Sequence, residues 1–140
     1  MIIFKRDFFT DLKLFFTTLI KKRWLDKYGY YYYLSVLEEH KKKDLKKLIR
    51  AINNELKSYN FITNLKDDYL VFLSNYGTFG SFEKPNNVYV NIQRTSKEIS
   101  LTIIHEIVHL ILEAEPLFEH LDHEKKEQLV EKRFNELIET

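Results

Sequence analysis

The sequence contains no cysteine among its 140 residues, and only three glycines and two prolines. Without cysteine the chain can form no disulfide, bind no metal through a thiolate and use no thiol nucleophile. Any metal site must therefore be built from histidine and carboxylate side chains. The absence of disulfides also agrees with a reducing cytosol.

Long apolar runs are missing as well. The most apolar segment lies at the N-terminus, where Lys5, Arg6, Asp7, Asp11 and Lys13 interrupt it, and no small-residue cleavage site follows. This segment is too short and too often charged to be a signal or a membrane anchor. We therefore expect a cytoplasmic protein with no membrane partner, beginning with a helix.

The composition predicts a single compact domain spanning residues 1–140, with 44% hydrophobic and 31% charged residues. The net charge of +1 conceals an asymmetry: residues 1–60 carry 14 Lys/Arg against 7 Asp/Glu, and residues 101–140 carry 4 against 10. The basic part could face nucleic acid or an acidic partner. A run such as Lys41–Lys43 is more often a solvated surface, so direct nucleic-acid binding is not predicted.

The periodicity of apolar residues predicts an α+β fold with N-terminal helices and a small antiparallel β-sheet. An amphipathic helix is expected from about residue 5 to 27, ending near Gly29. A second helix, with Asp44 as its N-cap and an apolar face reaching Tyr59, should cover the back of the helix that follows the sheet. Residues 30–37 fit either a strand or a helix. Strands are expected at 69–74 and 88–93, with a short middle strand at 78–83.

Two further helices are delimited by terminal signals. Thr95 and Glu98 form a capping box, which places a helix start one or two residues after Thr95. Pro116 should end this helix, because the residue before a proline is pushed out of helical conformation. After a short acidic loop, Asp122 should begin a last helix that extends to the C-terminus.

The first of these helices carries an HExxH motif, formed by His105, Glu106 and His109 within LTIIHEIVHLIL. Residues four apart lie above one another on a helix, so the two histidines can reach one metal ion. Glu106 flanks the same face, close enough to take a proton from an activated water. Zinc would lower the pKa of that water toward neutrality, and Glu106 would act as the general base.

The surroundings of the motif are apolar nearly all round, as in a helix packed inside a domain. Two imidazoles and a carboxylate are costly to bury there without partners, and a metal ion is the simplest partner. The alternative is an ordinary core helix with two hydrogen-bonded histidines and a glutamate at its mouth.

A catalytic zinc usually takes three protein ligands and leaves one position open, so one ligand is missing from the motif. Glu127 lies on the apolar stripe of the last helix, which also includes Val130 and Phe134. We predict Glu127 as the third ligand of a single zinc ion. Glu131 would be an outer-shell acceptor, or the ligand itself if the register differs by a turn. His120 and His123 are further alternatives.

This arrangement resembles the gluzincins, and in so short a chain the ImmA/IrrE-type minimal zinc peptidases. The resemblance covers residues 44–138 and rests on HEIVH and on the EQLVEKRF segment from Glu127 to Phe134. It implies a zincin-like minimal metallopeptidase core at 44–140, preceded by a helical extension at 1–43. It also implies zinc binding by His105, His109 and Glu127, with Glu106 as catalytic base. The substrate would be a specific protein, often a DNA-binding repressor. A self-inhibited form is another possibility that the resemblance raises.

Two functions fit these features. The first is a zinc metalloendopeptidase whose substrate lies extended along an edge strand, expected at Val88–Ile92, with Tyr76 and Tyr89 as candidate donors to the oxyanion. The second is a non-catalytic module in which zinc braces the fold and the basic N-terminal helices engage a protein or nucleic acid.

Overall fold

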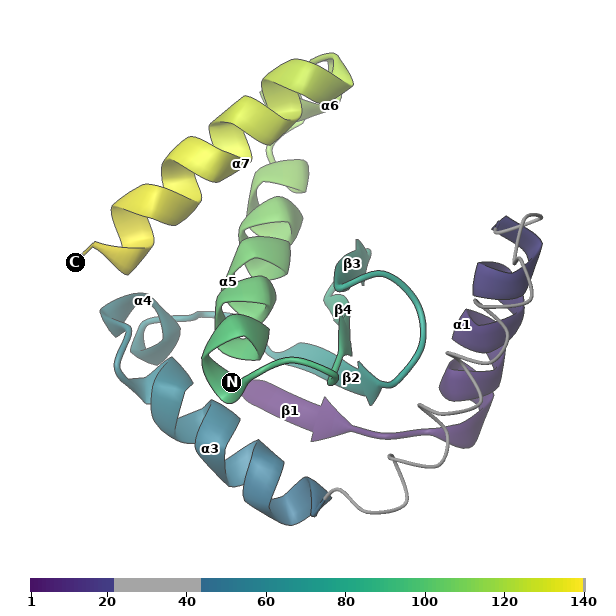
Figure 1. Ribbon diagram of the computed structural model, residues 1–140. Coiled ribbons are helices and arrows are strands. Elements are labelled where there is room, and N and C mark those ends of the chain that lie inside the picture. Colours follow the sequence, from purple (N-terminus) through teal and green to yellow (C-terminus); the bar gives the residue numbers. More distant parts are fainter. Residues whose placement is uncertain (22–43, 140) are drawn as a thin grey trace.

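The computed structural model describes residues 1–21 and 44–139, with the side chains of 18–21 excepted. This part of the chain has an α+β architecture with six helices and one four-stranded sheet (Figure 1). The expectations for residues 30–37, for Lys41–Lys43 and for the end of the first helix near Gly29 lie outside the described residues. The elements in chain order are β1 (Ile2–Lys5), α1 (Phe8–Lys21), α3 (Leu45–Lys57), α4 (Asn60–Thr63), β2 (Tyr69–Ser74), β3 (Gly80–Glu83), β4 (Asn87–Asn91), α5 (Ser96–Glu113), α6 (Pro116–Glu119) and α7 (His123–Ile138).

The sheet is mixed, so the prediction of an antiparallel sheet is wrong. Its strand order is β1-β2-β4-β3, in which β1 and β4 both run parallel to β2, and only β3 and β4 are antiparallel. The β3–β4 hairpin folds back so that β4 enters the sheet beside β2 and β3 becomes the edge. Residue alternation indicates strands but carries no information on their direction, which explains the error.

This topology also corrects the expected edge strand. The segment Val88–Ile92 falls largely in β4, which lies between β2 and β3 and pairs with both. Its backbone groups are therefore used within the sheet. The edge on this side is β3, which packs directly against α5.

The strand β1 was not expected from the sequence. A helix was predicted from about residue 5, but α1 begins at Phe8, after Asp7, whose carboxylate accepts hydrogen bonds from the backbone N–H groups of Phe9 and Thr10. The preceding residues pair with β2, and the backbone N–H of Tyr69 donates to the Met1 carbonyl at 2.8 Å. Four residues are too few to show a period, and this strand depends on a partner more than sixty residues away.

The helix α5 is the central element of the core. It packs against the sheet on one side and against α3 and α7 on others (Figure 1). The hydroxyl of Ser100 on α5 donates to the Ile52 carbonyl of α3 at 3.3 Å, which confirms that α3 covers the back of α5. None of the helices in the described ranges combines the length and apolar character needed to cross a lipid bilayer. The most buried apolar side chains of α5 are Ile99, Ile103, Ile104, Ile107 and Val108.

The helix starts predicted from the capping residues Thr95, Asp44 and Asp122, and the helix end predicted from Pro116, are confirmed. Thr95 and Glu98 form the reciprocal capping box at the start of α5, and Asp44 and Asp122 accept backbone hydrogen bonds at the starts of α3 and α7. Helix α5 ends at Glu113, ahead of Pro116, which opens the short helix α6 in the segment expected to be a loop. These caps fix where α5 and α7 begin, and so which side chains each helix presents to the other.

Candidate metal centre

Three side chains from two helices converge at one point. His105 and His109 lie one turn apart on α5, and Glu127 faces them from α7. One ligand atom from each of the three lies within 4.8 Å of the other two, so the group could hold a metal ion. His109 Nε2 lies 3.7 Å from Glu127 Oε2.

The donor set and its spacing suit a small divalent cation. Tetrahedral zinc with bonds of about 2.0–2.2 Å holds its ligand atoms roughly 3.4 Å apart. The 3.7 Å separation between His109 and Glu127 is near this value. The side chain of Glu127 is 44% exposed, which leaves its carboxylate free to close the wider gaps. Two imidazoles and one carboxylate also leave a fourth position open, as in catalytic zinc sites.

Aromatic side chains hold both histidine rings. Phe82 of β3 stacks on His109 with ring centroids 4.9 Å apart and an interplanar angle of 19°. Phe134 of α7 meets His105 edge-on at 5.4 Å. The two imidazoles lie 5.0 Å apart at 69° to each other. The rings are thus oriented by packing from the sheet and from α7.

The protonation state of His109 suits a metal ligand. Burial lowers the pKa of His109, and this effect outweighs the opposing influence of the Glu127 carboxylate. A lowered pKa keeps the imidazole neutral near pH 7, and only a neutral imidazole can donate a lone pair to a metal.

Glu106 is almost fully buried, at 8% exposure, beside the two histidines. Burial, and then the charge of Glu127, raises the pKa of Glu106 to about 7. A carboxyl group with a pKa near the working pH can both accept and release a proton. A dication at the neighbouring ligands would stabilise the charged form and bring this pKa down.

The edge strand β3 makes room for Glu106. A Cβ atom at Gly80 would collide with Glu106 Oε1 and lie 2.5 Å from the Thr102 methyl group. Only glycine therefore allows the strand to approach α5 this closely. Nothing in the sequence pointed to this role of Gly80.

Two ion pairs meet at the end of α5, and one of them comes from α7. Glu113, the last residue of α5, accepts contacts from Lys126 of α7 at 3.0 Å and from Lys84, just after β3, at 2.9 Å. The hydrogen bond from Lys84, followed by that from Lys126, lowers the pKa of Glu113 despite partial burial. Lys126 immediately precedes Glu127, so this cluster helps to place the third ligand. Glu113 thus anchors these segments to the end of α5.

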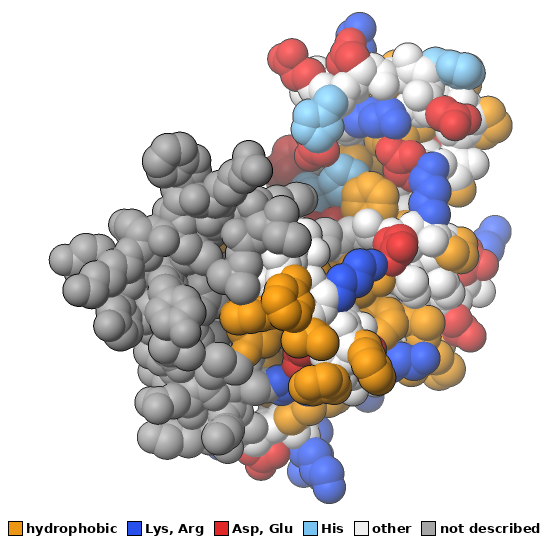
Figure 2. Space-filling view, turned by 90° about the vertical axis from the view of Figure 1, so that its right-hand side faces the viewer, with side chains coloured by type: hydrophobic (Ala, Val, Ile, Leu, Met, Phe, Trp, Pro, Cys, Tyr) orange, Lys and Arg blue, Asp and Glu red, His pale blue; other side chains and the backbone are white. Residues whose placement is uncertain are grey.

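The other candidate ligands lie at the margin of the cluster or outside it. Glu131, one turn beyond Glu127, is exposed, and its Oε1 lies 3.5 Å from the Asn135 side-chain amide. His123 has its Nδ1 at 3.8 Å from Glu127 Oε1, on a side chain that is 88% exposed. His120 is exposed at the C-terminal end of α6. Histidines and acidic side chains gather together on the upper part of the molecule in Figure 2.

The two tyrosines considered as oxyanion donors lie elsewhere. Tyr76 packs edge-on against Phe15 of α1 at 5.3 Å. Tyr89 stacks on Phe72 and donates from its hydroxyl to Glu83 at 2.6 Å, while Val88 and Val90 on either side of it point into the core. Neither tyrosine lines the cavity beside the motif.

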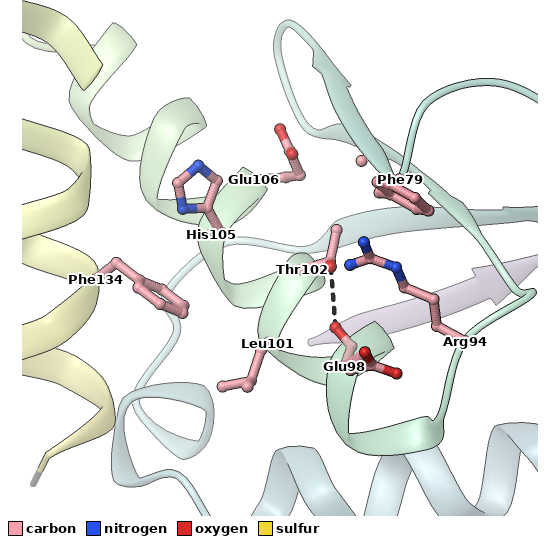
Figure 3. A pocket seen from close by; sticks show the side chains of 9 residues that line it. Phe79, Arg94, Glu98, Leu101, Thr102, His105, Glu106 and Phe134 are labelled. Carbon is pink, nitrogen blue, oxygen red and sulfur yellow. Dashed lines mark hydrogen bonds between the residues drawn. The ribbon is translucent and has the colours of Figure 1, made fainter. Parts of the chain in front are cut away.

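A cavity of about 340 Å³ opens beside His105 and Glu106 (Figure 3). Phe134 of α7 closes one side, and Phe79 and Arg94 lie on the opposite side. Thr102 and Leu101 of α5 complete the wall between them. The candidate metal centre is thus directly connected to a space that could receive part of a ligand.

Comparison with known proteins assigns no family: no family model, no curated protein and no solved structure matches the chain. Inference about function therefore starts from the side chains themselves. What the residues define is a candidate metal centre of His105, His109 and Glu127, with a buried carboxyl group and a cavity beside it.

Proposed function

We propose that the protein is a zinc-dependent metallopeptidase that hydrolyses peptide bonds of a protein substrate. The observation that carries this proposal is the convergence of His105, His109 and Glu127 next to the buried carboxyl group of Glu106. A purely structural metal site would gain nothing from a buried, unligated carboxyl group, whose desolvation is costly. A hydrolytic site needs such a group as its base.

When bound, zinc supplies a Lewis acid that lowers the pKa of water and polarises the scissile carbonyl group. Glu106 accepts the proton of the attacking water and then delivers it to the leaving amine nitrogen, so that its carboxylate is regenerated. Its burial keeps bulk water from competing for that proton. The stacking of Phe82 on His109 and the edge-on contact of Phe134 with His105 keep the ligands in place during the reaction.

The edge strand β3 is the proposed docking site for the substrate backbone. Among the described residues β3 pairs only with β4, so its other side offers backbone N–H and C=O groups to an added strand. Gly80 and Phe82 of β3 contact Glu106 and His109, respectively. A peptide paired with β3 would therefore pass directly in front of the site.

Membership in the ImmA/IrrE-type zincins, a zincin-like fold and a DNA-binding repressor as substrate remain part of this proposal. The family and the fold are supported by HEIVH on a buried helix and by Glu127 facing it from the following helix, whereas the repressor is implied only by the resemblance. The α+β architecture is compatible with them.

A zinc-braced binding module is the second candidate, and one observation favours it. Helix α7 buries only Val130 fully, so a metal bridge from α5 to Glu127 would add substantially to its attachment. This function requires zinc but does not require Glu106.

Glu106→Gln separates the two candidates. The zinc-loaded wild-type protein should cleave members of a peptide library made by digesting a bacterial proteome, with new termini detected by mass spectrometry. Glu106→Gln should keep its zinc and lose at least about a hundredfold in rate, because general-base catalysis contributes about 10²–10⁴-fold. Glu131→Gln, a glutamate on the exposed side of α7, is the matched control. Equal cleavage by wild type and Glu106→Gln would exclude the peptidase mechanism.

A further inference from the structure

The cavity beside Glu106 contains one cation among largely apolar walls. The guanidinium of Arg94 lies over the ring of Phe79, with its central carbon 3.4 Å from the ring centroid. In Figure 3 this guanidinium is directed into the cavity, toward Thr102 and the side of Glu106. Phe79, Leu101 and Phe134 supply apolar surface around it.

Arg94 has no ion pair within the described ranges 1–21 and 44–139. No carboxylate oxygen there lies within 4.0 Å of its guanidinium nitrogens, although the side chain is half-buried. Arginine carries five N–H donors in a planar fork that matches a carboxylate in a two-point contact. The ring of Phe79 covers one face of the guanidinium, so the N–H groups at the edge of the guanidinium remain for such a contact.

Glu98 is the acidic side chain that could compete with a ligand for Arg94. It lines the same cavity, but its Oε2 accepts hydrogen bonds from the backbone N–H and the hydroxyl of Thr95, at 3.0 and 2.7 Å. The capping box thus keeps Glu98 committed to the start of α5. The edge of Arg94 remains available for an acidic group that arrives with a ligand.

We propose that Arg94 binds a carboxylate of the substrate, so that the cavity selects an acidic residue or a C-terminal carboxylate next to the scissile bond. This inference rests on the proposed peptidase function, because the cavity shares His105 and Glu106 with the metal centre. A volume of about 340 Å³ is at the small end for ligand clefts and suits one side chain.

The energetics favour an acid over its neutral isosteres. An apolar side chain entering the cavity would remove water from Arg94 without replacing its hydrogen bonds, which is costly. An amide would supply one neutral acceptor, whereas a carboxylate supplies two charged ones. A lysine or arginine side chain would face Arg94 with like charge. This site should therefore bind a carboxylic acid more tightly than the corresponding amide.

The test measures binding rather than turnover, on the zinc-loaded full-length protein. The probes are phosphoramidates of the form phosphoryl–Xaa, which anchor on the metal through phosphoryl oxygens and carry Xaa directly beside the metal-binding group, at the position of a residue next to the scissile bond. One pair compares Xaa Glu with Xaa Gln, both as C-terminal amides, and reports a side-chain carboxylate. The other compares Xaa Leu as a free acid with Xaa Leu as an amide, and reports a C-terminal carboxylate.

In wild type, at least one acid should bind about tenfold or more tightly than its amide, as expected for a charge-assisted contact. The pair that shows the preference identifies the source of the carboxylate. Arg94→Gln should reduce the preference to about twofold or less, because it should weaken binding of the acid probes much more than binding of the amide probes. Arg94→Lys should retain part of it, because a point charge replaces the fork. Lys97→Gln, which removes a nearby exposed cation that does not line the cavity, should keep the full preference.

Two results would overturn the inference in distinguishable ways. If all probes bind in a zinc-dependent manner but neither acid is preferred in wild type, Arg94 does not select the substrate and the peptidase proposal survives. If no probe binds and the purified protein takes up no zinc, the proposed function fails and the inference fails with it. Because the acid and amide probes are compared on the wild-type protein, this result does not depend on the folding of any variant.

Discussion

At the scale of single residues, the proposed catalysis depends on how closely β3 approaches Glu106. Gly80 has no Cβ, and this absence allows the carboxyl group of Glu106 to stay beside the histidines. The other glycine with a special role, Gly77, has a positive φ of 88°, and a Cβ atom there would meet Leu14 at ordinary contact distance. One glycine therefore serves the site and the other serves the turn.

Gly80→Ala should impair hydrolysis without unfolding the protein. The new methyl group meets both the Glu106 carboxyl group and the Thr102 methyl group, and moving these side chains should cost about 1–3 kcal/mol. The displaced base should slow cleavage by about tenfold or more. Zinc content should not change.

Gly77→Ala is the matched control for that substitution. It places a side chain at positive φ and should lower the free energy of unfolding by about 1 kcal/mol, measured by urea denaturation. Activity per folded molecule should stay at the wild-type level. If Gly80→Ala cleaves as fast as Gly77→Ala, the close packing of β3 on Glu106 has no catalytic role.

At the scale of elements, the position of α7 decides whether Glu127 reaches the histidines. Val130 is the only fully buried side chain of α7, and Phe134, Leu137 and Ile138 are partly buried against the core. The ion pair between Lys126 and Glu113 adds to this attachment. Glu113 joins Lys126 of α7 to Lys84 after β3. Lys84 is largely exposed and its contact is weakened by water, whereas the pair with Lys126 is mostly buried.

Glu113→Gln should weaken zinc binding several-fold and lower the free energy of unfolding by about 1 kcal/mol at pH 7. The pKa of Glu113 is lower in the folded protein than its ordinary value of 4.5, so its stabilising contribution is present above that value and is lost as pH falls through the lower folded pKa. The difference between wild type and variant, measured by urea denaturation, should therefore be full at pH 7 and shrink in acid. Glu115→Gln, an exposed neighbour, is the control. A difference that grows as pH falls would contradict the ion-pair explanation.

At the scale of the whole molecule, the core lies between the sheet, α5 and α3, and the candidate metal centre lies at its border with α7. Each of these three elements contributes fully buried side chains that do not contact the metal centre, namely Val71, Val90, Ile52 and Ile104. Each of these side chains contributes roughly 1.5–3 kcal/mol. The fold of this core should therefore persist without zinc.

Removal of zinc with a chelator should lower the thermal midpoint by roughly 5–10 °C while leaving the far-ultraviolet circular dichroism at 20 °C nearly unchanged. The shift follows from about 2.7 kcal/mol of binding free energy at a zinc concentration a hundred times Kd. Complete loss of helical signal at 20 °C would show that the metal is structural, as the binding-module alternative requires.

The sequence was most informative where the signal is local. The capping box of Thr95 and Glu98 and the N-caps Asp44 and Asp122 were predicted because their partners lie within three residues. Glu127 was found on its helical face for a similar reason: the apolar stripe that includes Val130 also fixes which way Glu127 points.

What the sequence did not reveal depends on distant partners. The strand at Ile2–Lys5 exists through pairing with β2, and the parallel placement of β4 follows from how a hairpin folds back. The same is true of the packing of Gly80 on Glu106 and of Arg94 at the cavity. Contacts of this kind leave no periodic signal in the chain.

The most direct test of the account is the metal content of purified protein after supplementation with zinc, in wild type and in His109→Ala, Glu127→Ala and Glu131→Ala. The account predicts one zinc per chain in wild type and in Glu131→Ala, and loss of zinc in His109→Ala and Glu127→Ala. Circular dichroism would establish that each variant is folded. Folded wild-type protein that takes up no zinc would contradict the account, and the HEIVH segment would then be an ordinary core helix.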